Sequence, residues 1–156
     1  MPLKNLEKKI QALELFDIEK ETLSIIRENS DTILSLIRGQ MGSKGVRGDS
    51  KFIQAKYGNA YQDITVFNKE NKGVGLGKKT DFVTMFMSGD FYASLQLEIT
   101  GTVFKVTSNV PYFSEINDQW NDGQLTKLDK INLKYFRDTY IIPELKRRFK
   151  RLSNGV

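Results

Sequence analysis

The densest group of side chains that could do chemistry in this sequence is a basic run near residue 150. Its members are Lys146, Arg147, Arg148, Lys150 and Arg151. Lys and Arg gathered on one helix attract phosphate groups whatever the base sequence, and the attraction weakens as salt is added. No helix-turn-helix pattern, RNA-binding signature or aromatic stacking platform accompanies the run. Three uses therefore remain open: contact with DNA, contact with an acidic protein neighbour, or a solvated helix end favoured by the helix dipole.

A second set of basic residues lies in a glycine-rich stretch, residues 39–80, which holds eight of the twelve glycines. Within it, residues 41–80 carry 8 basic and 3 acidic groups. A long segment of this kind is predicted to be a loop insertion that is either mobile or ordered by a partner. Its candidate subunit-interface residues are Lys44, Arg47, Lys51, Lys56, Lys78 and Lys79.

Other residues that could support catalysis are few. The chain has no cysteine and no histidine, which excludes disulfides, thiol nucleophiles, Cys/His zinc sites and imidazole acid–base catalysis. The glycines of residues 73–77 lack the spacing of a phosphate-binding loop. Asp81, Asp90 and Glu98 have neither a partner base nor metal-ligand spacing. We therefore predict neither an enzyme nor a cofactor site.

Helices are expected to begin the chain. Apolar residues recur at steps of three and four at Leu3, Leu6, Ile10 and Leu13. This spacing predicts a short helical extension over residues 1–16. Asp17 can cap a second helix over residues 17–38, and Gly39 is the expected stop. The apolar face continues in that helix at Leu23, Ile26, Ile33 and Ile37. Such a stripe is expected to pack on the protein's own sheet or on a neighbouring subunit.

Residues 81–125 predict a β-hairpin region. Alternating apolar residues on the two strands are Leu95, Leu97 and Ile99, then Phe104 and Val106. Gly101-Thr102 suits a two-residue type II′ turn between them. Just before the hairpin, Phe91 to Ser94 should form one helical turn that places an aromatic ring on the core. A further short strand is expected near residues 61–67, where apolar residues also alternate.

A long helix is expected over residues 126–152, opened by the capping-box-like pair Thr126 and Asp129. Pro143 should kink or divide this helix near Ile142, because proline lacks a donor and crowds the preceding turn. The whole chain, residues 1–156, then reads as one α+β domain. Its small antiparallel sheet (a hairpin over about 94–107 plus one or two further strands) packs against an N-terminal helix and the long C-terminal helix.

Charge changes sign along the chain. Residues 81–126 carry 1 basic and 6 acidic groups, whereas residues 127–156 carry 9 basic and 3 acidic ones. Opposite patches on one small domain allow head-to-tail contacts between copies, which produce rings or filaments; a merely solvated surface is the alternative. No apolar run is long enough to span a membrane, and the first residues are too charged for a secretory leader.

Several features together resemble a known family. Residues 87–94 read MSGDFYAS, a hairpin follows, and residues 141–145 of the last helix read IIPEL. This order resembles virion proteins of tailed phages, particularly those infecting Bacteroidetes, of the tail-completion or head–tail joining family. The resemblance covers roughly residues 31–152 and is densest at Ser88, Gly89, Phe91 and Ser94. The first helix and the longer 39–80 stretch depart from the family's usual form.

The resemblance implies a structural subunit that forms a ring in the neck, between portal and tail, around the DNA channel. It implies no active site, and its partners would be copies of itself, the portal and other neck or tail proteins. The product would wait in the host cytoplasm and end in the virion, without a membrane partner. Residues 39–80 and 81–126 would meet neighbouring subunits, and the basic helix end would face DNA or an adjacent ring. The alternative is a basic nucleic-acid-binding protein without enzymatic activity.

Overall fold

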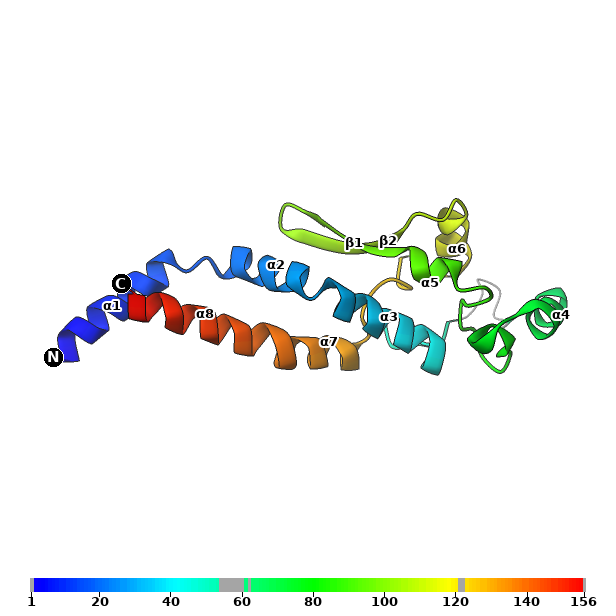
Figure 1. Cartoon of the computed structure of the whole chain (residues 1–156), viewed down its shortest axis with the longest axis horizontal. Helices are drawn as coiled ribbons and strands as arrows, with labels where there is room; N and C mark the ends of the chain where they lie inside the picture. Colours follow the sequence, from blue (N-terminus) through cyan, green and yellow to red (C-terminus); the bar gives the residue numbers. More distant parts are fainter. Residues whose placement is uncertain (1, 54–60, 62, 121–122, 156) are drawn as a thin grey trace.

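A computed structural model describes residues 2–53, 61, 63–120 and 123–155, and the molecule is elongated (Figure 1). Three consecutive helices run along its length: α1 (Pro2–Leu15), α2 (Ile18–Glu28) and α3 (Ser30–Lys44). The last helical segment returns beside them as α7 (Lys130–Phe136), the π-helical turn η2 (Arg137–Ile141) and α8 (Ile142–Gly155). Both ends of the chain therefore lie at the same end of the molecule (Figure 1).

The remaining elements gather toward the other end. The hairpin strands β1 (Leu95–Thr100) and β2 (Val103–Ser108) pair antiparallel and lie against α2 and α3. Around them are α4 (Asp63–Lys72), the short η1 (Gly75–Lys78), α5 (Asp90–Ser94) and α6 (Phe113–Trp120). The predicted α+β class, with a small antiparallel hairpin and a long C-terminal helix, is confirmed.

The hydrophobic core lies where α2 and α3 meet the hairpin and the start of the last helix. Its buried residues include Ile26, Ile33, Ile37 and Met41 from the helices, Phe91, Leu95 and Val106 from the hairpin region, and Leu125 and Phe136. In β1 and β2 the predicted register is confirmed, because Leu97 pairs with Val106 and Thr100 with Val103 across the Gly101-Thr102 turn. As expected, Phe91 is buried from the single helical turn of α5.

The apolar stripe of α1 does not pack on the sheet. Leu3, Leu6, Ile10 and Leu13 are 73%, 55%, 48% and 63% exposed. Ala12 is the one residue of the described α1 side chains that is buried, and the helix lies against α8. Packing on the protein's own sheet is confirmed for Ile26, Ile33 and Ile37, which are buried in one core with Leu95 and Val106. The α1 part of the stripe does not pack there, and its large side chains remain about half exposed or more.

The predicted helix over residues 17–38 is two helices. Asp17 caps α2 as expected, accepting a 2.9 Å hydrogen bond from the backbone N–H of Lys20. The chain then breaks at Asn29, and α3 continues past Gly39 to end at Gly45, which has the left-handed φ of +61°. Gly39 was the wrong stop because the residues after it, Gln40 and Met41, are buried against the rest of the fold and hold the helix together.

Residues 39–80 are less of a loop than predicted. Besides the end of α3, they contain α4 and η1. The strand expected near residues 61–67 is wrong, because residues 63–67 begin α4; residue 62 lies outside the described part. Apart from β1 and β2, the described residues show a single isolated bridge, between Val46 and Phe52. An alternation of only four residues is a weak signal for a strand. Here the segment is helical, and the helix places the side chain of Lys69 in the buried contact described below.

The C-terminal helix begins one turn later than its predicted opening at Thr126. Asp129 is itself the cap and accepts a 2.7 Å hydrogen bond from the backbone N–H of Asn132. The irregularity expected near Pro143 takes the form of η2, in which the N–H of Ile142 donates to the carbonyl of Arg137. A π-helical turn places the helix past a proline without ending it, since the hydrogen-bond ladder shifts by one residue.

Gly39, inside α3, and Gly45, at its C-cap, give a test of where this helix ends. Gly45→Ala should lower the free energy of unfolding by about 1–3 kcal/mol, because the backbone at residue 45 has a left-handed φ that a residue with a Cβ rarely adopts. That Cβ would also come within 2.3 Å of the Phe82 ring. Gly39→Ala meets nothing within 4 Å and should raise stability by about 0.5–1 kcal/mol, as in any exposed helix interior. Urea unfolding of both variants measures this; a destabilising Gly39→Ala would contradict the helix boundary.

Candidate interaction surfaces

Arg148, in the middle of the predicted basic run, is engaged inside the molecule. Its guanidinium lies 2.7 Å from a carboxylate oxygen of Glu21, 2.7 Å from one of Glu28 and 2.9 Å from one of Glu144. Its side chain is only 17% exposed. Because Glu21 and Glu28 belong to α2, this residue fastens α8 to α2 and does not face a partner.

Two of the carboxylates around Arg148, those of Glu28 and Glu144, have a lowered pKa. Hydrogen bonds from Arg147 and then Arg148 lower the pKa of Glu144 to about 2. The Arg148 hydrogen bond also lowers the pKa of Glu28, and the three carboxylates together raise the pKa of Arg148. We call Arg148, Glu21, Glu28 and Glu144 the α2–α8 charge cluster; its function is to join two helices.

The rest of the basic run remains on the surface. Arg147 pairs with Glu144 one turn before it and is 53% exposed. Lys146, Lys150 and Arg151 are exposed, and in the described part of the chain no ion pair engages them. Residues 146 and 150, and residues 147 and 151, are one helical turn apart, so these cations share one side of α8. This side is the part of the run that can meet a phosphate or an acidic protein.

The candidate interface residues of the 39–80 stretch are likewise divided. Arg47 bonds through its guanidinium to Asp49, at 2.7 Å, and is 16% exposed. Lys79 lies 3.9 Å from a carboxylate oxygen of Asp81, with its ammonium 4.2 Å from the centre of the Phe82 ring. The exposed ones are Lys44, Lys51 and Lys78. Lys56 lies outside the described residues.

Gly73 and Gly77 of the glycine-rich run are packed against the rest of the protein, whereas Val74 and Gly75 between them are exposed. A Cβ on Gly77 would lie 2.2 Å from the carbonyl oxygen of Met87, and the N–H of Gly77 already donates to the carbonyl of Val74. These glycines allow a close approach of two backbones. The Gly77 N–H is therefore used inside the protein and is not free to donate to a phosphate.

A buried lysine was not singled out by the sequence. Lys69 of α4 is 2% exposed and donates a 2.6 Å hydrogen bond to the carbonyl of Phe86 and a 3.3 Å bond to the hydroxyl of Thr84. Its ammonium also lies 5.0 Å from the centre of the Tyr61 ring. Burial lowers the pKa of Lys69. No sequence signal marks it, because its partners lie 15 and 17 residues further along the chain.

The polar groups around Lys69 are used structurally. The Tyr92 hydroxyl donates to the carbonyl of Thr84, and the N–H of Thr84 donates to the Tyr61 hydroxyl at 3.0 Å. Burial raises the pKa of Tyr92 well above its usual value. Lys69 donates to two acceptors and so joins α4 to residues 84–86. We interpret this cluster as a structural contact.

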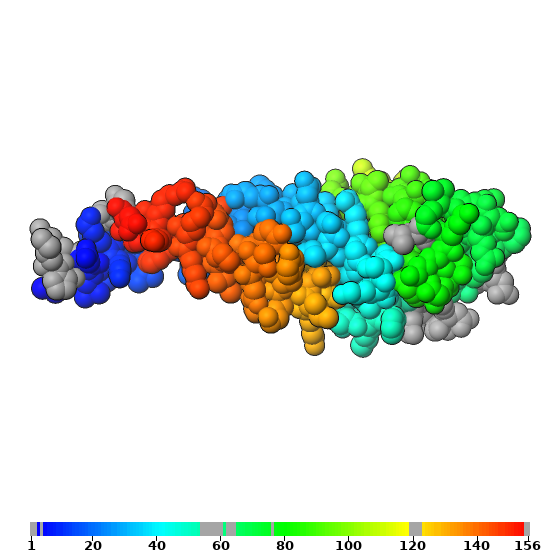
Figure 2. Space-filling model, turned by 60° about the horizontal axis from the view of Figure 1, so that its bottom comes forward, coloured from blue at the N-terminus to red at the C-terminus, as the bar shows by residue number. Residues whose placement is uncertain are grey.

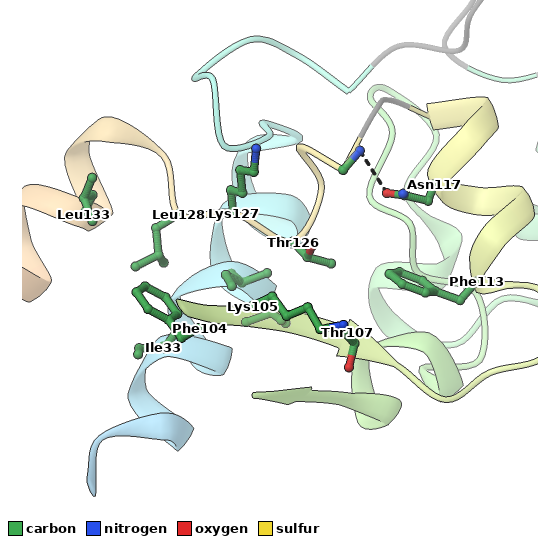
Figure 3. Close-up of a pocket in the computed structure, with 13 residues that line it drawn as sticks. Ile33, Phe104, Lys105, Thr107, Phe113, Asn117, Thr126, Lys127, Leu128 and Leu133 are labelled. Carbon is green, nitrogen blue, oxygen red and sulfur yellow. Dashed lines mark hydrogen bonds between the residues drawn. The ribbon is translucent and has the colours of Figure 1, made fainter. Parts of the chain in front are cut away.

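A groove opens between the hairpin and the last helix. It measures about 590 Å³ and is lined by Ile33 and Ile37 of α3, Phe104 and Val106 of β2, and Leu128 and Leu133. Phe104 and Leu128 lie close together at one end of this groove, and Lys105 and Lys127 are at its rim (Figure 3). We call it the apolar groove. Its lining is mostly hydrophobic, which suits an apolar side chain better than a charged metabolite.

Comparisons with protein-family models, with curated proteins and with solved structures give no match. Among the described residues, no group of three or more acidic side chains is arranged to hold a metal ion. No described helix has the length and apolarity needed to cross a bilayer.

The α2–α8 charge cluster predicts a sharp difference between two neighbouring arginines. Arg148→Ala should lower the free energy of unfolding by about 1–3 kcal/mol, because Glu21 and Glu28 then lose this cation and only Glu144 keeps an arginine partner, Arg147. Arg151→Ala, an exposed residue one turn away, should change stability by less than about 0.5 kcal/mol. Equal effects in chemical denaturation would argue against the cluster.

The same cluster predicts an acid dependence. Glu144 has a pKa depressed from about 4.5 to about 2 in the folded state, so its contribution is present above pH 4.5 and lost as pH falls toward 2. The stability of the wild type should therefore decline across that range more steeply than that of Arg148→Ala. Unfolding curves recorded from pH 5 to pH 2 test this.

Lys69 gives a further prediction. Lys69→Ala should destabilise by about 2–4 kcal/mol, since the buried stem is lost and the carbonyl of Phe86 loses its donor. Lys72→Ala, an exposed lysine at the end of the same helix, should stay within about 0.5 kcal/mol of the wild type. Because the folded pKa of Lys69 lies below 10.5, the wild type should also gain stability relative to Lys69→Ala as pH rises toward 10.5.

Proposed function

We propose that the protein is a structural subunit of a ring in the head–tail connector of a tailed bacteriophage, where it joins portal to tail around the DNA channel. The observation that carries an assembly role is the exposed apolar stripe of α1, whose four members are each about half exposed or more. Single exposed apolar residues are ordinary on a monomer, but a contiguous row of them marks an interaction site. The connector itself is proposed from the family resemblance.

The geometry of the motif that carries the resemblance supports the proposal. Gly89 has a φ of +103° and precedes α5, in which Phe91 and Tyr92 are buried. β1 starts directly at Leu95, so the turn sets the position of the hairpin. The motif is thus a structural joint at the base of the hairpin, as expected of a subunit whose work is to hold a shape.

The exposed cations of α8 support a contact with DNA or with a neighbouring ring. Lys146, Lys150 and Arg151 are exposed residues of α8. The C-terminal part of α8 (red) lies beside α1 (blue) at one end of the molecule (Figure 2). Exposed carboxylates of the 81–126 segment, including Asp90, Glu115 and Asp118, lie on or beside α5 and α6 in the other half. Charges of opposite sign on separate parts of one subunit favour head-to-tail contacts. The same three cations are what favours the alternative, a basic nucleic-acid-binding protein.

Location in the particle tests the connector proposal. In virions made from a genome that carries this gene, a gold-labelled antibody against the protein should mark the junction of head and tail. Particles made without the gene product should show heads and tails that do not join. Virions from which the product is absent, or label along the capsid, would count against a connector role.

The basic side of α8 gives a separate test. Changing Lys146, Lys150 and Arg151 to Glu should weaken binding of duplex DNA by the assembled protein and make its salt dependence shallower, by as much as about 3 in the logarithmic slope. The same change at Lys44, Lys51 and Lys78 is a matched control with equal loss of charge. In samples that sedimentation shows to be assembled, it should leave most of the slope in place. Strong DNA binding by the dilute monomer would favour the alternative function.

A further inference from the structure

We infer that α1 of one copy docks in the apolar groove of a second copy. The inference rests on the proposed function in one respect: it names the contact by which subunits of the ring would join. Its evidence is two surfaces on the same chain, an amphipathic helix without cover and an apolar groove without an occupant.

The donor is α1. Its stripe residues lie at positions i, i+3, i+7 and i+10, the spacing with which an amphipathic helix places apolar anchors in a groove. At 1.5 Å per residue, the stripe from Leu3 to Leu13 is about 15 Å long. Burial of Ala12 and an edge-to-face contact between Phe16 and Phe149, with ring centres 5.5 Å apart, hold α1 at the end of α8.

The acceptor is the apolar groove in the middle of the molecule. Leu133 on its wall is 52% exposed and Phe104 is 38% exposed, so large side chains there are accessible from outside. Buried residues of α3, such as Ile33 and Ile37, form its floor. A volume of about 590 Å³ falls within the range of protein pockets that enclose an apolar ligand.

Charges at the edges favour this pairing. Glu7 and Glu14 are seven residues apart and so flank the stripe on the same side of α1. The rim of the groove carries Lys105 and Lys127, both exposed. Lys105 lies 3.1 Å from a carboxylate oxygen of Glu98, whereas the ammonium of Lys127 has no ion pair among the described residues. When α1 docks, Glu7 or Glu14 of one copy can pair with Lys127 of the other, and this pairing sets the direction in which α1 lies in the groove.

A contact of this kind is heterologous, because each copy offers a helix and a groove that are different surfaces. Repeating it produces a closed ring or an open filament. The competing arrangement is an isologous pair of α1 helices from two copies, which would stop at a dimer and leave the groove empty. The two arrangements are separated by experiment.

Cross-linking provides the first test, since the chain has no cysteine. In a double variant with Ile10→Cys and Leu133→Cys, mild oxidation should link copies into a ladder of dimers, trimers and larger species on a non-reducing gel. Gln11→Cys with Leu133→Cys, which moves the thiol off the stripe, should give no ladder. A dimer from Ile10→Cys alone, with nothing larger from the double variant, overturns the inference in favour of the α1 pair.

Complementation provides the second test. Ile10→Asp places a charge in the α1 stripe, and Leu133→Asp places a charge in the wall of the groove. Each should weaken self-association about tenfold or more. Mixed in equal amounts, the two variants should form a one-to-one dimer and nothing larger, because one intact helix meets one intact groove. Sedimentation velocity measures the species. Both residues are exposed, and unchanged thermal melting curves confirm that each variant folds.

The outcomes distinguish the contact from the proposed function. If the wild type assembles and both Asp variants assemble equally well, the α1–groove contact is wrong while a ring role stands. If the wild type is a monomer at every concentration and no ladder forms, the contact is also wrong. The connector role is judged separately, by the position of the protein in virions.

Discussion

The position of the long C-terminal helix depends on one buried side chain, Gln40 of α3. Its amide nitrogen donates to the carbonyl of Lys127 at 2.6 Å, and its amide oxygen accepts from the backbone N–H of Asp129 at 2.9 Å. Asp129 in turn caps the helix through Asn132. Gln40 is 1% exposed, so any of these groups left without its partner would cost about 1–3 kcal/mol. Because residues 127 and 128 also line the apolar groove, the bonds that start the helix set the shape of that groove.

The two ends of the helix pair are joined by polar contacts, while much apolar surface stays outside. At one end Gln40 holds the start of α7; toward the other, the α2–α8 charge cluster holds α8. Large apolar residues meanwhile stand exposed on α1, and also at Ile131 and Tyr135 of α7, which are 68% and 48% exposed. A helix pair held by a buried amide at Gln40 and by the mostly covered Arg148 guanidinium keeps one register, since half-satisfied partners are costly. Because the helices are held in one register, the exposed apolar residues of α1 and α7 keep fixed positions on the surface, where other copies can contact them.

Features that depend on neighbours in sequence could be predicted, and those that depend on distant partners could not. The hairpin, its two-residue turn and the Asp17 cap follow from local spacing, and all are present. Gly39 and Gly45 look alike in sequence, and the choice between them depends on the burial of Gln40 and Met41. In the same way, nothing in the run of residues 146–151 distinguishes Arg148 from its neighbours. Its role appears only when the carboxylates of α2, more than a hundred residues earlier, lie beside it.

The charge cluster and the exposed helix are mechanically connected. α1 lies against α8 through the contact of Phe16 with Phe149, and Phe149 follows Arg148 directly. The direction of α1 therefore depends on how firmly α8 is held to α2. Protonating the carboxylates of the cluster, or removing Arg148, loosens the support of α1 without touching its apolar stripe. An effect of Arg148 on assembly would then arise from misplacement of a docking helix. The same variant would leave the exposed cations Lys146, Lys150 and Arg151 unaltered, so a loss of DNA binding in this variant would follow from lost assembly and not from lost cations.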